Sequence, residues 1–115
     1  MPFDTIKSPI VSSLADDPDL VDLVEMFVDQ LPERLSAMHR AFEQSDLRRL
    51  RQLAHQLKGS GGSYGFAVLT FAAAELEEGC KAQALDRIGD ALRELSDLVP
   101  RLKARPDASE KPGGA

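Results

Sequence analysis

Several kinds of side chain are scarce in this chain of 115 residues, and each shortage excludes a class of protein. The chain has no tryptophan, one tyrosine and one cysteine, Cys80, so an intrachain disulfide is impossible. A single cysteine also fits a reducing compartment, and we expect a cytoplasmic location. The N-terminus lacks the charged-then-apolar pattern of a signal peptide, and no apolar run approaches the roughly 20 residues that span a bilayer. We therefore expect no membrane partner.

Positive charge is scarce as well. Lysine and arginine number 14 against 19 aspartates and glutamates, which gives a formal net charge of −5. Nucleic acid is an unfavourable partner for such a chain, because its phosphates attract an excess of cations. A phosphate-binding loop is also missing, since the glycines near residue 60 follow no strand and the GxxxxGK[ST] pattern is absent. With no nucleotide or metal pattern in the sequence, an enzyme with its own turnover is the weakest of the functions considered.

Leucine and alanine are abundant and recur at helical spacing in four stretches. The first is expected to start at Pro18, capped by Asp16 or Asp17, and to end near Ser45, with a kink or a break caused by Pro32. The others are 47–64, capped by Ser45-Asp46 and ended by Gly65, then 66–81, with Val68 among its inward residues, and 85–102, where Pro100 bends or shortens the end. Short connections between them predict an all-α protein, an antiparallel four-helix bundle.

The two ends of the chain carry less pattern. Residues 1–9 are expected to be irregular, and Ile10, Val11 and Leu14 could form a short lead-in helix to a bundle over residues 10–103. Residues 104–115 include two prolines and two glycines but no large apolar side chain. Such a segment cannot bury enough surface to offset its ordering entropy, so a disordered tail is predicted there.

The helix at 47–64 carries a histidine on its polar side. With about 100° per residue, four residues form a compact apolar seam: Leu50, Ala54, Leu57 and Gly61. His55 falls roughly 130° from that seam, on the same side as Arg51, Lys58, Gly59 and Gly62. An exposed imidazole, whose ordinary pKa is about 6.5, is largely neutral and nucleophilic at neutral pH. With cations beside it, His55 is suited to carrying a phosphoryl group.

The run His55-x-Leu57-Lys58-Gly59-Ser60, followed by Gly65 and Leu76-Glu77, resembles the signature of histidine-containing phosphotransfer (HPt) domains. Asp17-Pro18-Asp19-Leu20 and Leu31-Pro32-Glu33-Arg34-Leu35 resemble the family's first long helix, and the likeness covers roughly residues 10–103. The resemblance implies a phosphorelay intermediate. Nε2 of His55 would take a phosphoryl group from the aspartyl phosphate of a hybrid histidine kinase's receiver domain and pass it to a response regulator.

The resemblance also implies how the work is divided between partners. The chain would be a phosphocarrier without a kinase domain or a cofactor of its own, and Mg²⁺ would be held by the receiver partner. The sequence after His55 does not match the His-Glu-x-x-Thr/Asn-Pro of the histidine kinases' own dimerisation helix. A monomer is the expected state.

Further residues are candidates for supporting the histidine. Lys58, three residues on, can reach a phosphoryl group on His55, and Arg51, four residues before, is a second contact. The family usually adds a residue from the neighbouring helix that orients the imidazole, and spacing suggests Glu77, which could accept the Nδ1 proton. Lys81, one turn after Glu77, would approach the same surface.

Other residues on this surface have two interpretations each. Gly59 and Gly62 either keep space clear for a partner or the phosphate, or reflect fraying of the helix toward the turn at Gly65. We expect close helix packing at Gly61. The run Arg48, Arg49 and Arg51 is either a solvated helix face or the place where an acidic receiver surface docks. Tyr64 and the segment Ile10–Leu14 are candidates for the apolar edge of the docking face.

One alternative function uses the same fold. The chain could be a non-phosphorylated binding module that sequesters or inhibits a receiver or kinase partner through the face around His55. The presence of the histidine, the lysine and the glycine together favours the carrier, because a pure binder needs no imidazole. His39 lacks this context, and we expect it to be an ordinary helix residue.

Overall fold

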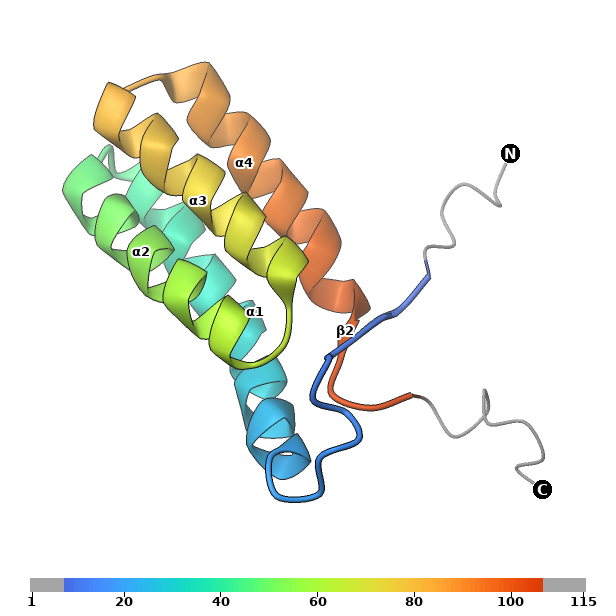
Figure 1. The fold of residues 1–115 in the computed structure, drawn as a ribbon. Helices are drawn as coiled ribbons and strands as arrows, with labels where there is room; N and C mark the ends of the chain where they lie inside the picture. The colour runs from blue at the N-terminus through green and yellow to red at the C-terminus, as the bar shows by residue number, and fades with distance from the viewer. Residues whose placement is uncertain (1–7, 107–115) are drawn as a thin grey trace.

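The computed structural model describes residues 8–106 and contains four long helices packed side by side (Figure 1). They are α1 (Val21–Glu43), α2 (Leu47–Ser63), α3 (Ala67–Ala82) and α4 (Leu85–Leu98). α3 packs between α2 and α4, and α1 closes the bundle against both of them. The predicted all-α four-helix bundle is confirmed, and α2 and α4 occupy opposite corners of it.

The core consists of one apolar stripe from each helix. On α2 the stripe is the predicted seam of Leu50, Ala54, Leu57 and Gly61, all of them buried. Each large apolar side chain removed from water contributes about 1.5–3 kcal/mol to folding. Because these four residues fix the rotation of α2, the polar side of that helix, including His55, must face outward.

One residue that was predicted to point inward is exposed, and so is a leucine near the start of α1. Val68, predicted to point inward, is 40% exposed, and Leu23 is 48% exposed. Each occupies the first turn of its helix, and the first turns of α1 extend past the end of α2 (Figure 1), where no helix covers them. The helical period alone cannot show where a neighbouring helix stops.

The start of α1 differs from its prediction. The helix begins at Val21, three residues after the expected Pro18. Asp17 forms a turn instead: its carboxylate accepts the backbone N–H of Asp19 at 2.9 Å, and its carbonyl accepts that of Val21 at 2.9 Å. Pro32 does not break α1, because it lies on the exposed side of the helix, where water can reach the carbonyl that lacks a donor.

Both ends of α2 follow the prediction. Asp46 is the N-cap, and its side chain accepts the backbone N–H of Arg49 at 3.0 Å. After Ser63 the chain turns into α3 through Gly65, whose φ of +87° lies in the left-handed region. A Cβ at Gly65 would also collide with Ser12, so this turn requires glycine twice over.

The predicted lead-in helix is absent, and a strand takes its place. β1 (Ile10–Val11) pairs in parallel with β2 (Leu102–Lys103) near the C-terminus. Ser12 then donates its backbone N–H to the carbonyl of Lys103 at 2.9 Å and its hydroxyl to the carbonyl of Tyr64 at 2.7 Å. The conformation of residues 10–11 depends on a strand about 90 residues away in sequence, so the local pattern of apolar residues could not predict it.

The C-terminal end differs from its prediction in two ways. The last helix is shorter than predicted, and the packed part of the chain extends further. α4 ends at Leu98, and a 3₁₀ turn, η2 (Val99–Arg101), follows around Pro100, as the shortening prediction anticipated. Ala104 is buried, and Arg105 forms ion pairs with Asp22 at 3.1 Å and Glu25 at 3.3 Å. The packed chain thus extends past the predicted boundary at 103, whereas the rest of the expected tail (107–115) and residues 1–7 lie outside the described residues.

Among residues 8–106, no helix is long and apolar enough to cross a membrane.

Candidate functional site

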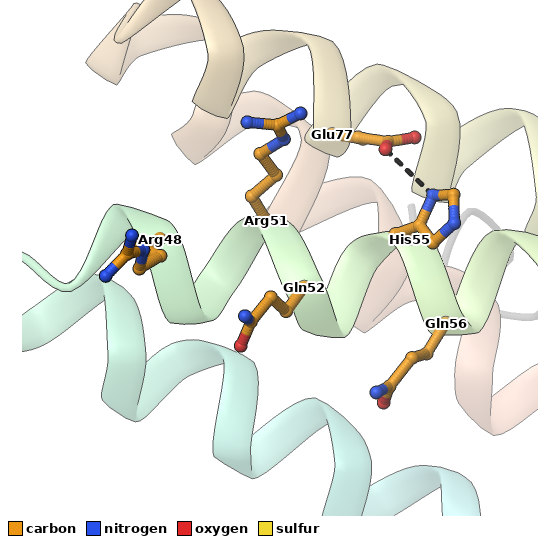
Figure 2. A pocket seen from close by; sticks show the side chains of 6 residues that line it. All are labelled: Arg48, Arg51, Gln52, His55, Gln56 and Glu77. Atoms are coloured by element: carbon orange, nitrogen blue, oxygen red, sulfur yellow. Dashed lines mark hydrogen bonds and ion pairs between the residues drawn. The ribbon is translucent and has the colours of Figure 1, made fainter.

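His55 stands in the middle of α2 with 68% of its side chain exposed. Its ring lies over the boundary between α2 and α3, where Glu77 of α3 reaches Nδ1, and the other ring nitrogen points away from Glu77 (Figure 2). The orientation follows from the buried seam on the opposite side of α2. The expected exposure of this histidine is therefore found.

Glu77 is a buried carboxylate shared by two basic side chains. Its side chain is 6% exposed, Oε2 lies 2.9 Å from Nδ1 of His55, and Oε1 lies 2.7 Å from Nζ of Lys58. Apart from that ion pair, Oε1 has no hydrogen-bond partner among the described residues. A buried carboxylate needs such compensation, because desolvation alone would favour its neutral form.

The charge on Glu77 determines the tautomer of His55. The ammonium of Lys58 is the largest cause that lowers the pKa of Glu77 below 4.5, burial opposes it, and the imidazole lowers it further. An ionised carboxylate can only accept a hydrogen bond, so the proton of the neutral ring must sit on Nδ1. Nε2 then carries the free lone pair and faces solvent, as a nucleophile must.

Lys58 is held by Glu77 in this structure. It is a half-buried side chain whose ammonium already has a partner at 2.7 Å, and the sequence predicted only its reach toward a phosphoryl group. Both roles are compatible with its position three residues after His55, since a flexible four-carbon chain can move between two nearby anions.

The glycines of α2 differ in what surrounds them. A Cβ at Gly61 would lie 3.1 Å from Cβ of Leu69 and 3.2 Å from the backbone nitrogen of Thr70, and one at Gly62 would lie 3.3 Å from Oγ1 of Thr70. A Cβ at Gly59 would meet nothing within 4 Å. Close approach to α3 accounts for Gly61, as predicted. Gly62 also packs against α3, which the sequence did not predict, whereas Gly59 borders open space.

Two open depressions meet at His55. One, of about 570 Å³, extends toward the N-terminus of α2 and is lined by Arg48, Arg51, Gln52, His55, Gln56 and Glu77 (Figure 2). The other, of about 540 Å³, extends toward the C-terminus and is lined by His55, Gln56, Gly59, Ser60, Ser63 and Tyr64. The histidine is thus reachable from both directions along the helix.

Tyr64 lines the second depression, as its candidacy for the docking edge requires. Its ring stacks on Phe27 of α1, with centroids 4.5 Å apart and an angle of 17° between the planes. The segment Ile10–Leu14 lies behind this turn, where Ser12 bonds the carbonyl of Tyr64 and Ser13 donates to that of Gly65. This segment therefore holds the turn that carries Tyr64 through backbone and side-chain hydrogen bonds.

Other candidates are not gathered at the histidine. Lys81 pairs with Glu78 at 3.3 Å and lines neither depression. His39 bridges to Oγ of Ser96 at 3.0 Å between α1 and α4. Cys80 is buried, and burial raises the pKa of its thiol. Within residues 8–106, no three His, Cys, Asp or Glu side chains are grouped so that they could hold a metal ion.

Sequence reasoning missed several residues near the site. Gln52 and Gln56 line the depressions, and Thr70 donates its hydroxyl to the carbonyl of Lys58 at 3.1 Å. The two glutamines lie three residues before and one residue after His55, which places them on the polar side of α2. This spacing is the sequence signal that could have identified them. No sequence signal pointed to Thr70, because its contact with Lys58 depends on how α2 and α3 pack against each other.

The comparison with protein-family models identifies the class. Residues 22–105 match the model described as Hpt domain, and the chain belongs to that family. The match supports a histidine phosphotransfer module of two-component signalling. Domains of this family are phosphocarriers rather than kinases, and the family implies interaction with receiver domains. Neither the search of curated proteins nor that of solved structures found a match.

Proposed function

We propose that this module is a phosphorelay intermediate that accepts a phosphoryl group on Nε2 of His55 from the aspartyl phosphate of a hybrid kinase's receiver and transfers it to a response regulator. The observation that supports it is the ionised, buried Glu77, 2.9 Å from Nδ1 of an imidazole that is 68% exposed. This contact keeps the proton on Nδ1 and the lone pair on the outward nitrogen. Phosphoryl transfer requires such positioning more than covalent help from the protein.

In the transfer step, the imidazole is the one group of this chain that forms or breaks a covalent bond. The Nε2 lone pair forms the N–P bond as the P–O bond to the partner's aspartate breaks, and that aspartate leaves as a carboxylate. The ring gains positive charge, which Glu77 offsets through Nδ1–H. Lys58 can offset the charge of the phosphoryl oxygens. We expect the receiver to hold the Mg²⁺ of the reaction. The return step, to a second aspartate, is the reverse.

The partner would meet an apolar edge as well as the histidine. Met26 of α1 is 58% exposed, next in sequence to Phe27, which stacks on Tyr64 beside the second depression. Leu23, one turn earlier on α1, is also exposed. Interfaces usually combine such apolar side chains with a polar rim. We include these two exposed side chains of α1 in the proposed docking face, in addition to Tyr64.

The decisive experiment is phosphoryl acceptance from a phosphorylated receiver domain. Wild type, His55→Ala and the matched control His39→Ala are compared. We expect acid-labile, alkali-stable label on wild type and His39→Ala, and none on His55→Ala. His39 is a fair control because it is the chain's other histidine and lies between α1 and α4.

The alternative of a pure binding module makes the opposite prediction. A folded wild-type chain that binds receivers and takes no label from several of them would overturn the proposal. Label that persists on His55→Ala would instead place the phosphoryl group on another residue. Binding of His55→Gln to the receiver should remain close to wild type, because the interface area extends well beyond one side chain.

A further inference from the structure

Three arginines on the first half of α2 stand out in an acidic protein. Arg48, Arg49 and Arg51, which we call the arginine cluster, are all exposed, and the chain carries a net charge of −5. Arg48 and Arg51 line the depression that ends at His55, and Figure 2 shows them along α2 on the N-terminal side of the histidine. Arg48 lies two helical turns from His55.

The guanidinium groups of the arginine cluster have no hydrogen bond or ion pair with any residue from 8 to 106. Six other basic side chains form ion pairs: Lys58 with Glu77, Lys81 with Glu78, Arg87 with Glu75, Arg93 with Asp90, Arg101 with Asp97, and Arg105 with Asp22 and Glu25. Arg34, Arg40 and Lys103 form no ion pair among the described residues either, but they line neither of the depressions that meet at His55. Glu77, the acidic group in the same depression, is already shared by Lys58 and His55. The positive charge of the cluster therefore projects into solvent.

This charge does not serve the transferred group directly. Figure 2 shows the second ring nitrogen on the side of the ring away from Glu77, whereas Arg51 extends toward α3 on the other side of Glu77. The cation close to the histidine on the other side is Lys58, three residues on. A function in meeting the partner, rather than in stabilising the phosphoryl group, fits the arginine positions.

We propose that the arginine cluster is an electrostatic docking site for an acidic strip on the receiver partner, placed one to two helical turns from the phosphorylated aspartate. The inference rests on the proposed function and adds the partner's charge and its orientation. The acidic strip lies over the N-terminal half of α2, and the partner's apolar surface lies over Tyr64 and Met26. Charges at the rim of an interface chiefly raise the association rate, by a factor of 10 to 10³ at low ionic strength.

The test measures the second-order rate constant of phosphoryl transfer from a phosphorylated receiver as salt is varied. The variant is Arg48→Gln/Arg51→Gln, and the matched control is Arg87→Gln/Arg93→Gln. The control removes the same two charges from exposed positions on α4, the helix at the corner opposite α2. All three proteins are the full chain.

We expect the variant to lose about tenfold in kcat/KM at low salt, mostly through KM, while the control stays within about twofold of wild type. The difference should vanish near 1 M salt, where the Debye length is about 3 Å. A variant as fast as wild type at low salt, or a control equally impaired, overturns the docking assignment. A wild-type chain that accepts no phosphoryl group at any salt overturns the proposed function instead, so the two failures are distinguishable.

Discussion

At the scale of single residues, the site depends on how one buried carboxylate is shared. Glu77 bonds the imidazole through one oxygen and Lys58 through the other. Lys58 lowers the pKa of Glu77, so the carboxylate stays ionised and accepts the hydrogen bond that orients the ring. Lys58 thus has a function before any phosphoryl group arrives.

Replacing Glu77 should affect the ring before it affects the fold. In Glu77→Ala, Nδ1 loses its acceptor, and we expect the neutral ring to shift toward the tautomer protonated at Nε2, with acceptance of the phosphoryl group slowed about tenfold. A hydrogen bond to a charged group is worth about 1.5–3 kcal/mol, and 1.4 kcal/mol corresponds to tenfold in rate. Nitrogen chemical shifts of the imidazole measure the tautomer ratio.

Glu77→Gln is the matched variant, because its amide oxygen can still accept from Nδ1 while the ion pair with Lys58 is lost. We expect it to keep most of the tautomer preference. A tautomer ratio that is the same in Glu77→Ala and wild type would contradict the orienting function, whatever happens to the rate.

At the scale of the helix, we expect two glycines of α2 to have different functions, one in packing of the bundle and one in access to the docking face. Gly61 lets α3 approach closely, since a Cβ there would press on Leu69 and Thr70. Gly59 has open space around it, so its weak helix propensity has no compensation in packing. A position that lowers helix stability without any gain inside the bundle is expected where something outside must approach.

Alanine at these two glycines should act in opposite directions. Gly59→Ala should raise the free energy of unfolding by about 1 kcal/mol, because alanine is the better helix former. Gly61→Ala should lower it, because α3 must move. Urea unfolding followed by circular dichroism measures both. Phosphoryl acceptance by Gly59→Ala should fall despite the added stability; normal acceptance by this variant would remove the clearance interpretation.

At the scale of the whole molecule, the two ends of the described chain pair with each other beside the bundle. β1 pairs with β2, and Ser12 and Ser13 bond the turn between α2 and α3. That turn carries Tyr64, whose ring lines the depression next to His55. The position of Tyr64 therefore depends on segments that are distant in sequence from the histidine helix.

The C-terminal strand should contribute to stability through burial and little through charge. Leu102 is 2% exposed, and Leu102→Ala should lower the free energy of unfolding by about 2–5 kcal/mol. Arg105→Ala removes only ion pairs of a half-exposed side chain and should cost less than about 1 kcal/mol. Chemical denaturation of both variants provides the comparison, and equal costs would show that β2 adds no packing to the bundle.

The sequence by itself determined the helices, the buried seam of α2 and the outward direction of His55. These depend on local period and on capping, as at Asp46, and such features are complete within one helix. The pairing of His55 with Glu77 was predicted through the family resemblance, and the geometry agrees with it.

Only the tertiary structure decided the features that depend on contacts between distant segments. Ile10 and Val11 became a strand because Leu102 and Lys103 lie beside them. Leu23 is exposed in a part of α1 that extends past the end of α2 (Figure 1), and Val68 is exposed although the next residue of α3, Leu69, is fully buried. The engagement of Lys58 by Glu77, and the absence of any such partner for the arginine cluster among the described residues, likewise follow from which side chains face each other across helices. A one-dimensional period fixes the direction of a side chain around its own helix, and only packing fixes what that side chain meets.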